Sequence, residues 1–305
     1  MRALLFTVIT FPFAAWASDP GSISVDKNQR VAYQAAPLSK PQGGAKFQGS
    51  HFIHPLKTPS GFTVTCLQPK DHLHHFGLWW PWKFIETGGR KILCWELQKG
   101  EGLIQAKSAK PIAHGLETHS IYLDRKAPDG PEVQIHEYTK IITSNPINQP
   151  AAGYTLDLII SQETAGEEII TIPAYQYSGF AFRGNAQWKK GTSSILTSTG
   201  NDRDTANGTP AAWARVEGNT RKGETAGVLI MSHPENPHFP EKLRTWDKQY
   251  RGAVFINFNP VQDQPLSIKP GTPLTRRYRL FIYDGTLSST EAEDLWKAFA
   301  SNQLK

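Results

Sequence analysis

The sequence predicts an all-β fold, an antiparallel β-sandwich or supersandwich that ends in a short helix. Residues 133–140 and 274–283 alternate apolar and polar side chains, whereas 154–160, 227–232 and 253–258 are more continuously apolar, as in buried strands. The 25 glycines and 22 prolines punctuate these segments at spacings typical of hairpins. Because strand follows strand without intervening helices, an antiparallel sandwich is favoured over a βαβ fold.

One helix is predicted near the C-terminus. Ser288 and Glu291 form a capping-box pattern, and Leu295, Trp296 and Phe299 then share one helical face. We expect this helix to close an edge of the sheet.

One segment is predicted to begin as a tail before the first strands, and two others are predicted to be long loops. Residues 18–45 are rich in proline and glycine and are expected to begin as an exposed tail, while 183–213 and 233–252 are long polar loops. No linker or internal repeat divides residues 18–305, so we expect a single β-sandwich domain.

Residues 1–17 have the pattern of a secretory signal peptide. Arg2 precedes a short apolar stretch, and Ala15-Trp16-Ala17 matches a small-residue cleavage site before Ser18. An uncleaved anchor helix is disfavoured because the apolar run is short and contains Pro12. We therefore expect export to the periplasm or beyond the cell, with no membrane span in the mature chain.

Charge and cysteine content narrow the functional classes. The formal charge is +6, but acidic and basic residues are interspersed, whereas a nucleic-acid binder usually carries a basic stripe. A small molecule or an oligosaccharide is the expected partner.

Cys66 and Cys94 could pair in an oxidising compartment or remain buried thiols, and the sequence leaves both possibilities open.

Residues 71–82 concentrate the chemistry of the chain. Asp71 precedes His72, His74 and His75, and Trp79, Trp80 and Trp82 follow; imidazole suits proton transfer near neutral pH. We take these three histidines and Asp71 as candidate catalytic groups. On an extended strand the first two histidines would share a side and could bind a divalent metal as a cofactor. The alternative that we favour is a metal-free pocket in which the histidines form hydrogen bonds.

Further candidates for substrate binding come from other parts of the chain. Alternation on a strand places Trp80 and Trp82 on one face and Trp79 on the other, so not every indole can face a ligand. Arginine suits bidentate recognition of a carboxylate or a pair of hydroxyls, and an indole can stack on a sugar ring. The candidate binding residues are His54, Trp80, Arg183, His233, Asn236 and Trp246.

Two stretches resemble a known family. Residues 54–61 read His-Pro-Leu-Lys-Thr-Pro-Ser-Gly, and residues 71–78 read Asp-His-Leu-His-His-Phe-Gly-Leu. They resemble an exported bacterial family filed as "methane oxygenase PmoA", a domain of unknown function, whose usual patterns are H-P-L-Y-T-P-S-G and D-H-x-H-H-R-G-L. Residues 177–183 and 233–237 also resemble its later blocks. Lys57 replaces the usual tyrosine and Phe76 the usual arginine; if that arginine binds an anionic group in relatives, this chain recognises a different ligand.

The oxygenase label conflicts with the sequence. The membrane methane oxygenase subunit is a helical protein with several spans, whereas this chain has a β pattern and no such spans, so we reject that activity. The family is similar in architecture to galactose-mutarotase-like supersandwiches, in which histidines and carboxylates act on sugar rings from a concave sheet. That similarity implies a fold more than a reaction.

We therefore expect an exported enzyme that acts on a carbohydrate or a sugar acid as a hydrolase, lyase or epimerase. The site would be rich in histidine and walled by aromatic side chains, with Asp71 orienting a histidine. The rival interpretation is a glycan-binding β-sandwich protein without catalysis. Perturbed histidine ionisation in one pocket would favour the enzyme, and an open aromatic strip would favour the binder.

Overall fold

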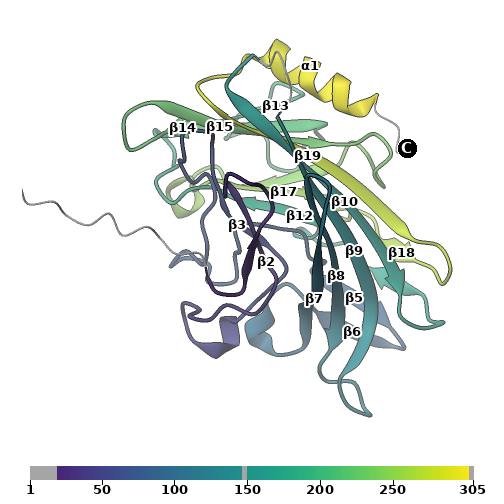
Figure 1. Cartoon of the computed structure of the whole chain (residues 1–305). Helices are drawn as coiled ribbons and strands as arrows, with labels where there is room; N and C mark the ends of the chain where they lie inside the picture. Colours follow the sequence, from purple (N-terminus) through teal and green to yellow (C-terminus); the bar gives the residue numbers. More distant parts are fainter. Residues whose placement is uncertain (1–18, 146–149, 302–305) are drawn as a thin grey trace, which may run out of the picture.

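The strands of the computed structural model, which describes residues 19–145 and 150–301, form three antiparallel sheets (Figure 1). The seven-stranded sheet has the order β1-β2-β3-β4-β12-β17-β16. Its strands are β1 (Ser22–Ser24), β2 (Val31–Gln34), β3 (Ile53–Leu56), β4 (Leu78–Trp79), β12 (Phe180–Arg183), β17 (Phe255–Asn259) and β16 (Lys242–Thr245). The all-β prediction is confirmed.

The other two sheets are built from the remaining strands. The eight-stranded sheet comprises, in order, β13 (Ser193–Thr197), β14 (Trp213–Asn219), β15 (Thr225–Ser232), β19 (Leu274–Asp284), β10 (Gly153–Thr164), β9 (Glu132–Ser144), β8 (Gly115–Asp124) and β7 (Gly102–Ile112). The four-stranded sheet comprises β18 (Leu266–Ile268), β11 (Ile170–Ile172), β5 (Phe84–Thr87) and β6 (Arg90–Leu93). Three 3₁₀ turns are η1 (Ala45–Phe47), η2 (Leu97–Lys99) and η3 (Gln249–Arg251).

The seven- and eight-stranded sheets pack face to face. Their shared core includes Leu78 and Phe180 from the first sheet and Leu156 and Leu280 from the second, all fully buried. The four-stranded sheet covers another part of the eight-stranded sheet through a cluster that joins its isoleucines to Tyr122. Burial of these apolar side chains is the main force that holds the layers together.

The C-terminal helix α1 (Ser289–Ala300) forms as predicted, with the capping box of Ser288 and Glu291. It lies over β14, β15 and β19 (Figure 1) and packs on Met231 and Phe281. Its position differs from the prediction, because it covers a face of the eight-stranded sheet and not an edge.

The segments predicted as a tail and as two long loops contain short strands. The expected tail 18–45 carries β1 and β2, and the expected loops 183–213 and 233–252 carry β13 and β16. Each of these strands has three to five residues, which is too few for an alternating pattern to stand out from neighbouring turns.

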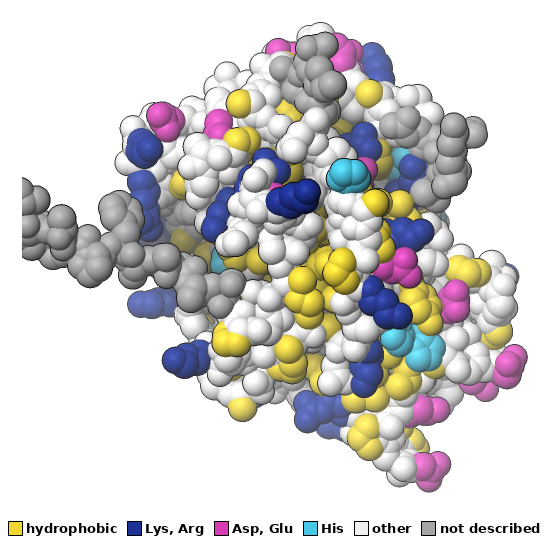
Figure 2. All heavy atoms as spheres, in the orientation of Figure 1, with side chains coloured by type: hydrophobic (Ala, Val, Ile, Leu, Met, Phe, Trp, Pro, Cys, Tyr) yellow, Lys and Arg dark blue, Asp and Glu magenta, His cyan; other side chains and the backbone are white. Residues whose placement is uncertain are grey.

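The surface shows no concentrated block of one charge on the face drawn in Figure 2, where basic and acidic side chains are dispersed among apolar ones. Within the part of the chain that the structure describes, no helix has the length and apolarity needed to span a membrane. The predicted signal peptide, residues 1–17, lies outside the described residues. Export and the single-domain boundary 18–305 stay predictions.

Candidate functional site

The candidate catalytic residues lie on a turn that leads into β4. The amide of His72 donates to the carbonyl of Pro69 (2.9 Å), and the amide of His75 donates to the carbonyl of His72 (3.1 Å). Gly77 then adopts φ 76°, in the left-handed region where glycine is favoured. The expectation of an extended strand here is therefore wrong.

The turn brings the three imidazoles together, although not in the way that the sequence suggested. The ring of His72 stacks on His75 with 4.6 Å between centroids, and the ring of His74 lies 5.4 Å from His72 and 5.0 Å from His75. The cluster lies on the outer face of the seven-stranded sheet, where Trp79 contacts His75 (5.0 Å). We call this region, residues 71–75 with the side chains that pack on them, the histidine face.

Asp71 joins the histidine face to β12. Its Oδ2 accepts a hydrogen bond from Arg183 Nη2 at 2.6 Å and lies 3.4 Å from His72 Nδ1. Burial tends to raise the pKa of Asp71, but the neighbouring guanidinium of Arg183 holds it below its ordinary value. Asp71 is therefore a carboxylate at neutral pH and can orient the imidazole of His72.

Aromatic side chains complete the histidine face. Trp246 contacts the rings of His72 (4.9 Å) and His75 (5.7 Å), and the guanidinium of Arg183 lies 4.7 Å from its ring. Tyr250 meets His72 edge-on at 4.6 Å and is 48% exposed. The structure thus places Trp246 beside the histidines and Arg183, with its ring buried, and Tyr250 adds a solvent-facing ring that the sequence analysis did not single out.

Burial keeps the histidines neutral. It lowers the pKa of His74 to about 4, with a further contribution from His72, and it lowers the pKa of the fully buried His75 well below its ordinary value. The pKa of His72 is also lowered by burial, and Asp71 offsets part of that effect. At neutral pH these imidazoles are bases and hydrogen-bonding groups, not cations.

Three buried polar atoms on the histidine face have no hydrogen-bond partner: His75 Nδ1, Trp79 Nε1 and Arg183 Nη1. A buried polar group without a partner costs free energy, so such groups point to sites where a ligand or water would supply the missing bond. Their concentration beside His72 makes this face the candidate site.

A metal is not supported by the described geometry. Within residues 19–145 and 150–301, no three histidine, cysteine, aspartate or glutamate side chains are arranged to hold a metal ion. The proposed metal ligands His72 and His74 thus lack a third ligand from that part of the chain, and the Asp71 oxygen nearest His72 is engaged by Arg183.

Cys66 and Cys94 are both free thiols.

Two of the predicted binding residues lie elsewhere. His233 follows β15, where Arg277 Nη1 lies 3.1 Å from its Nε2 and the ring of Phe299 lies 5.1 Å away. Asn236 bonds to both backbone groups of Arg277, at 2.6 and 2.9 Å. Both residues fix the loop after β15 to β19 beneath α1, so the expectation that they bind the substrate together with the histidines is wrong.

Trp80 and His54 also differ from expectation. As alternation predicted, the side chain of Trp80 faces away from that of Trp79. Its Nε1 donates a hydrogen bond to Glu137 of β9 at 2.7 Å, so the ring lies between the sheets. Trp80 therefore cannot stack on a ligand at the histidine face. His54 lies on β3, where its Nδ1 is 2.9 Å from the hydroxyl of Thr65. Burial and Lys57 lower the pKa of His54 to about 4, and it makes no ring contact with the cluster.

The interior holds a polar network that the sequence analysis missed. Glu137 is fully buried and accepts hydrogen bonds from Trp80, Gln162 (2.6 Å) and Thr139 (3.2 Å), while His51 Nε2 lies 2.6 Å away. The signal was present, because Glu137 alternates in register with the apolar residues at 133 and 135. A carboxylate in the apolar register of a strand predicts a buried, hydrogen-bonded group.

The geometry defines a class of protein, an antiparallel β-sandwich with a cluster of neutral histidines and aromatic rings on the outer face of one sheet. The chain belongs to the family of unknown function DUF6807, whose model matches residues 22–297. Comparison with the curated proteins gives no match.

Proposed function

We propose that this protein is an enzyme that acts on a carbohydrate or a sugar acid at the histidine face. The observation that carries the proposal is the chain of contacts from Arg183 through Asp71 to His72. A histidine held by a carboxylate at Nδ1 keeps Nε2 for proton transfer, and that arrangement is the ordinary construction of a general base. His72 is half-buried, so a substrate hydroxyl or a carbon-bound proton can reach it.

The role of each neighbour follows from its contacts. Asp71 orients His72, and Arg183 holds Asp71 through Nη2. Tyr250 provides the ring surface against which a sugar can pack, and the buried ring of Trp246 supports it from behind. Elimination and epimerisation begin when a base removes a proton from carbon, and in hydrolysis a base can activate the attacking water.

We further propose that the chain is exported and that residues 1–17 are removed. The Ala-x-Ala ending and the short apolar run support this part of the proposal. A relation to mutarotase-like supersandwiches would fit the stacked antiparallel sheets, but it rests on architecture alone. Methane oxygenation is not proposed.

The rival function is glycan binding without turnover, and the exposed ring of Tyr250 beside Trp246 favours it. A screen of oligosaccharides and uronic acids against the purified mature protein, with metal analysis of the same sample, separates the two. Turnover lost by more than about 100-fold in His72→Ala, with unchanged ligand affinity, supports the enzyme. Binding without turnover of any ligand supports the rival.

The matched control is His119→Ala. His119 is also half-buried and bonded to one neighbour, with 3.0 Å between its Nε2 and His136 Nδ1, but it lies on β8. His119→Ala should retain full turnover. If His72→Ala, His74→Ala and His75→Ala are all folded and all fully active, the site assignment is wrong.

A further inference from the structure

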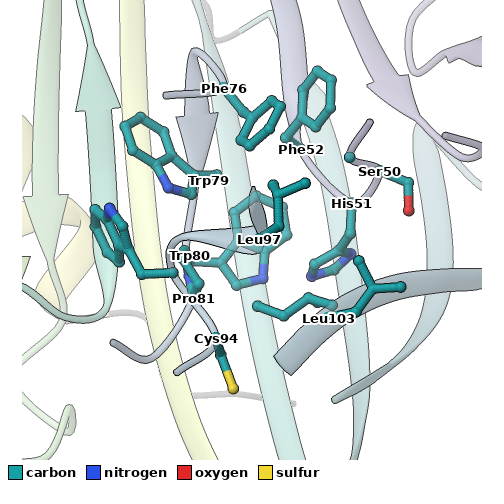
Figure 3. A pocket seen from close by; sticks show the side chains of 13 residues that line it. Ser50, His51, Phe52, Phe76, Trp79, Trp80, Pro81, Cys94, Leu97 and Leu103 are labelled. Carbon is teal, nitrogen blue, oxygen red and sulfur yellow. The ribbon is translucent and has the colours of Figure 1, made fainter. Parts of the chain in front are cut away.

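The outer face of the seven-stranded sheet continues beyond the histidines. Trp79 marks this face, because its ring lies in the same apolar cluster as Phe76, whereas the ring of Trp80 lies beside His51 between the sheets (Figure 3). Side chains that share the face of Trp79 can therefore contact a ligand that also contacts the histidines.

Arg244 of β16 stands in the same row of the sheet as Trp79. Arg244 pairs with Asn257 of β17. Asn257 pairs with Ala181 of β12, and Ala181 pairs with Trp79 of β4. Because directly paired residues of neighbouring strands point to the same face of a sheet, Arg244 rises from the outer face.

Aromatic contacts join Arg244 to the histidine face. Its Nη2 donates to the hydroxyl of Tyr177 at 3.2 Å, and its guanidinium carbon lies 5.1 Å from the centre of the same ring. The ring of Tyr177 lies 6.4 Å from that of Phe255, which stacks on His75 at 5.1 Å. Arg244 and the histidines thus lie over one continuous layer of rings.

The half-buried Arg244 forms no ion pair with a carboxylate of the described residues. Its Nη1 donates to the side-chain oxygen of the exposed Asn207 at 2.9 Å, so both terminal nitrogens are bonded to neutral groups. Arg183, which the sequence analysis chose for recognition of a carboxylate, is instead paired with Asp71. Of these two arginines, Arg244 is therefore the one whose charge remains for an anionic ligand.

The guanidinium of Arg244 has donors left for such a ligand. Each terminal nitrogen of a guanidinium carries two N–H groups, and Asn207 and Tyr177 use one from each nitrogen. Paired N–H groups match the two oxygens of a carboxylate. A phosphate monoester carries about −1.5 to −2 charges at neutral pH and calls for more than one cation. A single guanidinium therefore favours a carboxylate.

Arg244 is within reach of a sugar bound at His72. The ring of Trp246, two positions after Arg244, lies 4.9 Å from the ring of His72, and two residues of an extended chain span about 7 Å. We infer that Arg244, anchored by Tyr177, binds the carboxylate of the substrate and makes the histidine face selective for sugar acids over neutral sugars. The inference rests on the proposed function in taking the histidine face as the place where the sugar binds.

Matched acidic and neutral glycans test the inference. Oligogalacturonates and methyl glucuronide are each compared with the carboxyl-reduced compound, in which a hydroxymethyl group replaces the carboxylate, and with a sulfated counterpart. Calorimetric titration of the mature protein at neutral pH and constant ionic strength should show binding of the carboxylate at least about tenfold tighter than that of the neutral compound. Equal binding, a preference for the neutral or the sulfated compound, or no binding of any of them overturns the inference.

Two variants and one control complete the test. Arg244→Gln should weaken binding of the carboxylates about ten- to hundredfold without affecting the neutral compounds. Arg244→Lys keeps the charge but not the planar fork, so part of the preference should remain. The control Arg221→Gln removes the same charge from an exposed turn between β14 and β15 and should leave the preference unchanged. A folded Arg244→Gln that still prefers the carboxylates contradicts the inference.

Turnover is a separate readout, so the two proposals fail in different ways. A preference for carboxylates that depends on Arg244, without turnover, would keep the inference and remove the enzyme. Turnover of neutral sugars only, lost in His72→Ala, would keep the enzyme and overturn the inference.

Discussion

The molecule contains two carboxylate–histidine pairs whose surroundings differ. Asp71 and His72 lie on the outer face, 3.4 Å apart, with side chains 26% and 17% exposed. Glu137 and His51 lie between the sheets, 2.6 Å apart, with side chains 0% and 3% exposed. The outer pair leaves one imidazole nitrogen for a ligand, whereas both nitrogens of His51 are engaged. A carboxylate and an imidazole thus have a structural role between the sheets, and we propose that they serve proton transfer on the outer face.

An arginine lies near each pair, and the two arginines differ in whether they donate a hydrogen bond to the carboxylate. Arg183 donates directly to Asp71, so the outer carboxylate is fixed by one strong bond. Arg276 is fully buried and lies with its guanidinium 4.0 Å from the ring of Trp82, with no hydrogen bond from its nitrogens. Burial alone would raise the pKa of Glu137, but His51 and then Arg276 lower it, and the indole of Trp80 adds to this. The interior carboxylate is stabilised as an anion by several neighbours.

The largest expected effect is on stability, from Glu137→Ala. This change leaves His51, Trp80 and Gln162 without their acceptor between the sheets, so the free energy of unfolding should fall by about 3–5 kcal/mol. Denaturation with urea measures the loss.

Asp71→Ala is the matched change on the outer face. The fall should be only about 1–2 kcal/mol, because Asp71 is partly exposed and only Arg183 loses a strong bond. Equal losses in the two variants would contradict the division of roles between the pairs.

The second effect is on catalysis and its pH dependence. Turnover by His72 as a base should rise with pH through a pKa below 6.5 and reach a plateau near neutrality, because burial lowers the pKa of His72. Asp71 raises the pKa of His72, so Asp71→Asn should move the acid limb to lower pH and also reduce turnover at the plateau. Rate profiles of kcat/KM against pH for both proteins make the comparison. An acid limb that stays in place would show that the carboxylate does not act on His72.

The difference between the pairs also explains how much the sequence could predict. Alternation places Trp79 and Trp80 on opposite faces, and the capping box places α1, because both depend on local periodicity. Arg183 and Trp246 were chosen as candidates from residue chemistry, and the structure places both beside the histidines. His233 was assigned to the site on the same reasoning and lies under α1, since chemistry alone does not say which sheet a loop leaves. The contact of His51 with Glu137 spans 86 positions and needs the tertiary fold.

The third effect is a dependence of stability on pH. His54 and His74 have pKa values of about 4 in the folded protein and an ordinary value of 6.5. Between these values the unfolded chain binds protons that the folded chain does not, so stability should fall as pH falls from 6.5 toward 4. Each histidine contributes a slope of at most about 1.4 kcal/mol per pH unit.

Measurements of the unfolding free energy at several pH values between 6.5 and 4 test this dependence of stability on pH. His74→Gln should flatten the curve. The control His114→Gln, at an exposed turn between β7 and β8, should leave it as in the wild type. A curve with the same slope in His74→Gln would show that this imidazole is not buried in solution as the structure has it.

The smallest expected effect is a difference in the rate at which Cys66 and Cys94 react with a thiol reagent. Cys66 is half-buried beside the histidine face, where its amide donates to the carbonyl of Arg183 at 2.9 Å, and Cys94 is buried in the apolar cluster that joins the four- and eight-stranded sheets. Burial raises the pKa of both thiols, so neither is a reactive thiolate at neutral pH.

A thiol reagent should label Cys66 slowly in the native protein and should label Cys94 only after unfolding. A reductant should leave the melting temperature unchanged, because the two cysteines form no disulfide. Mass spectrometry of the labelled peptides distinguishes the two sites. If Cys94 is labelled as fast as Cys66 under native conditions, the region between the sheets opens readily. The fixed surroundings inferred for Glu137 and His51 would then be wrong, because a segment that opens to a reagent also admits water to that pair.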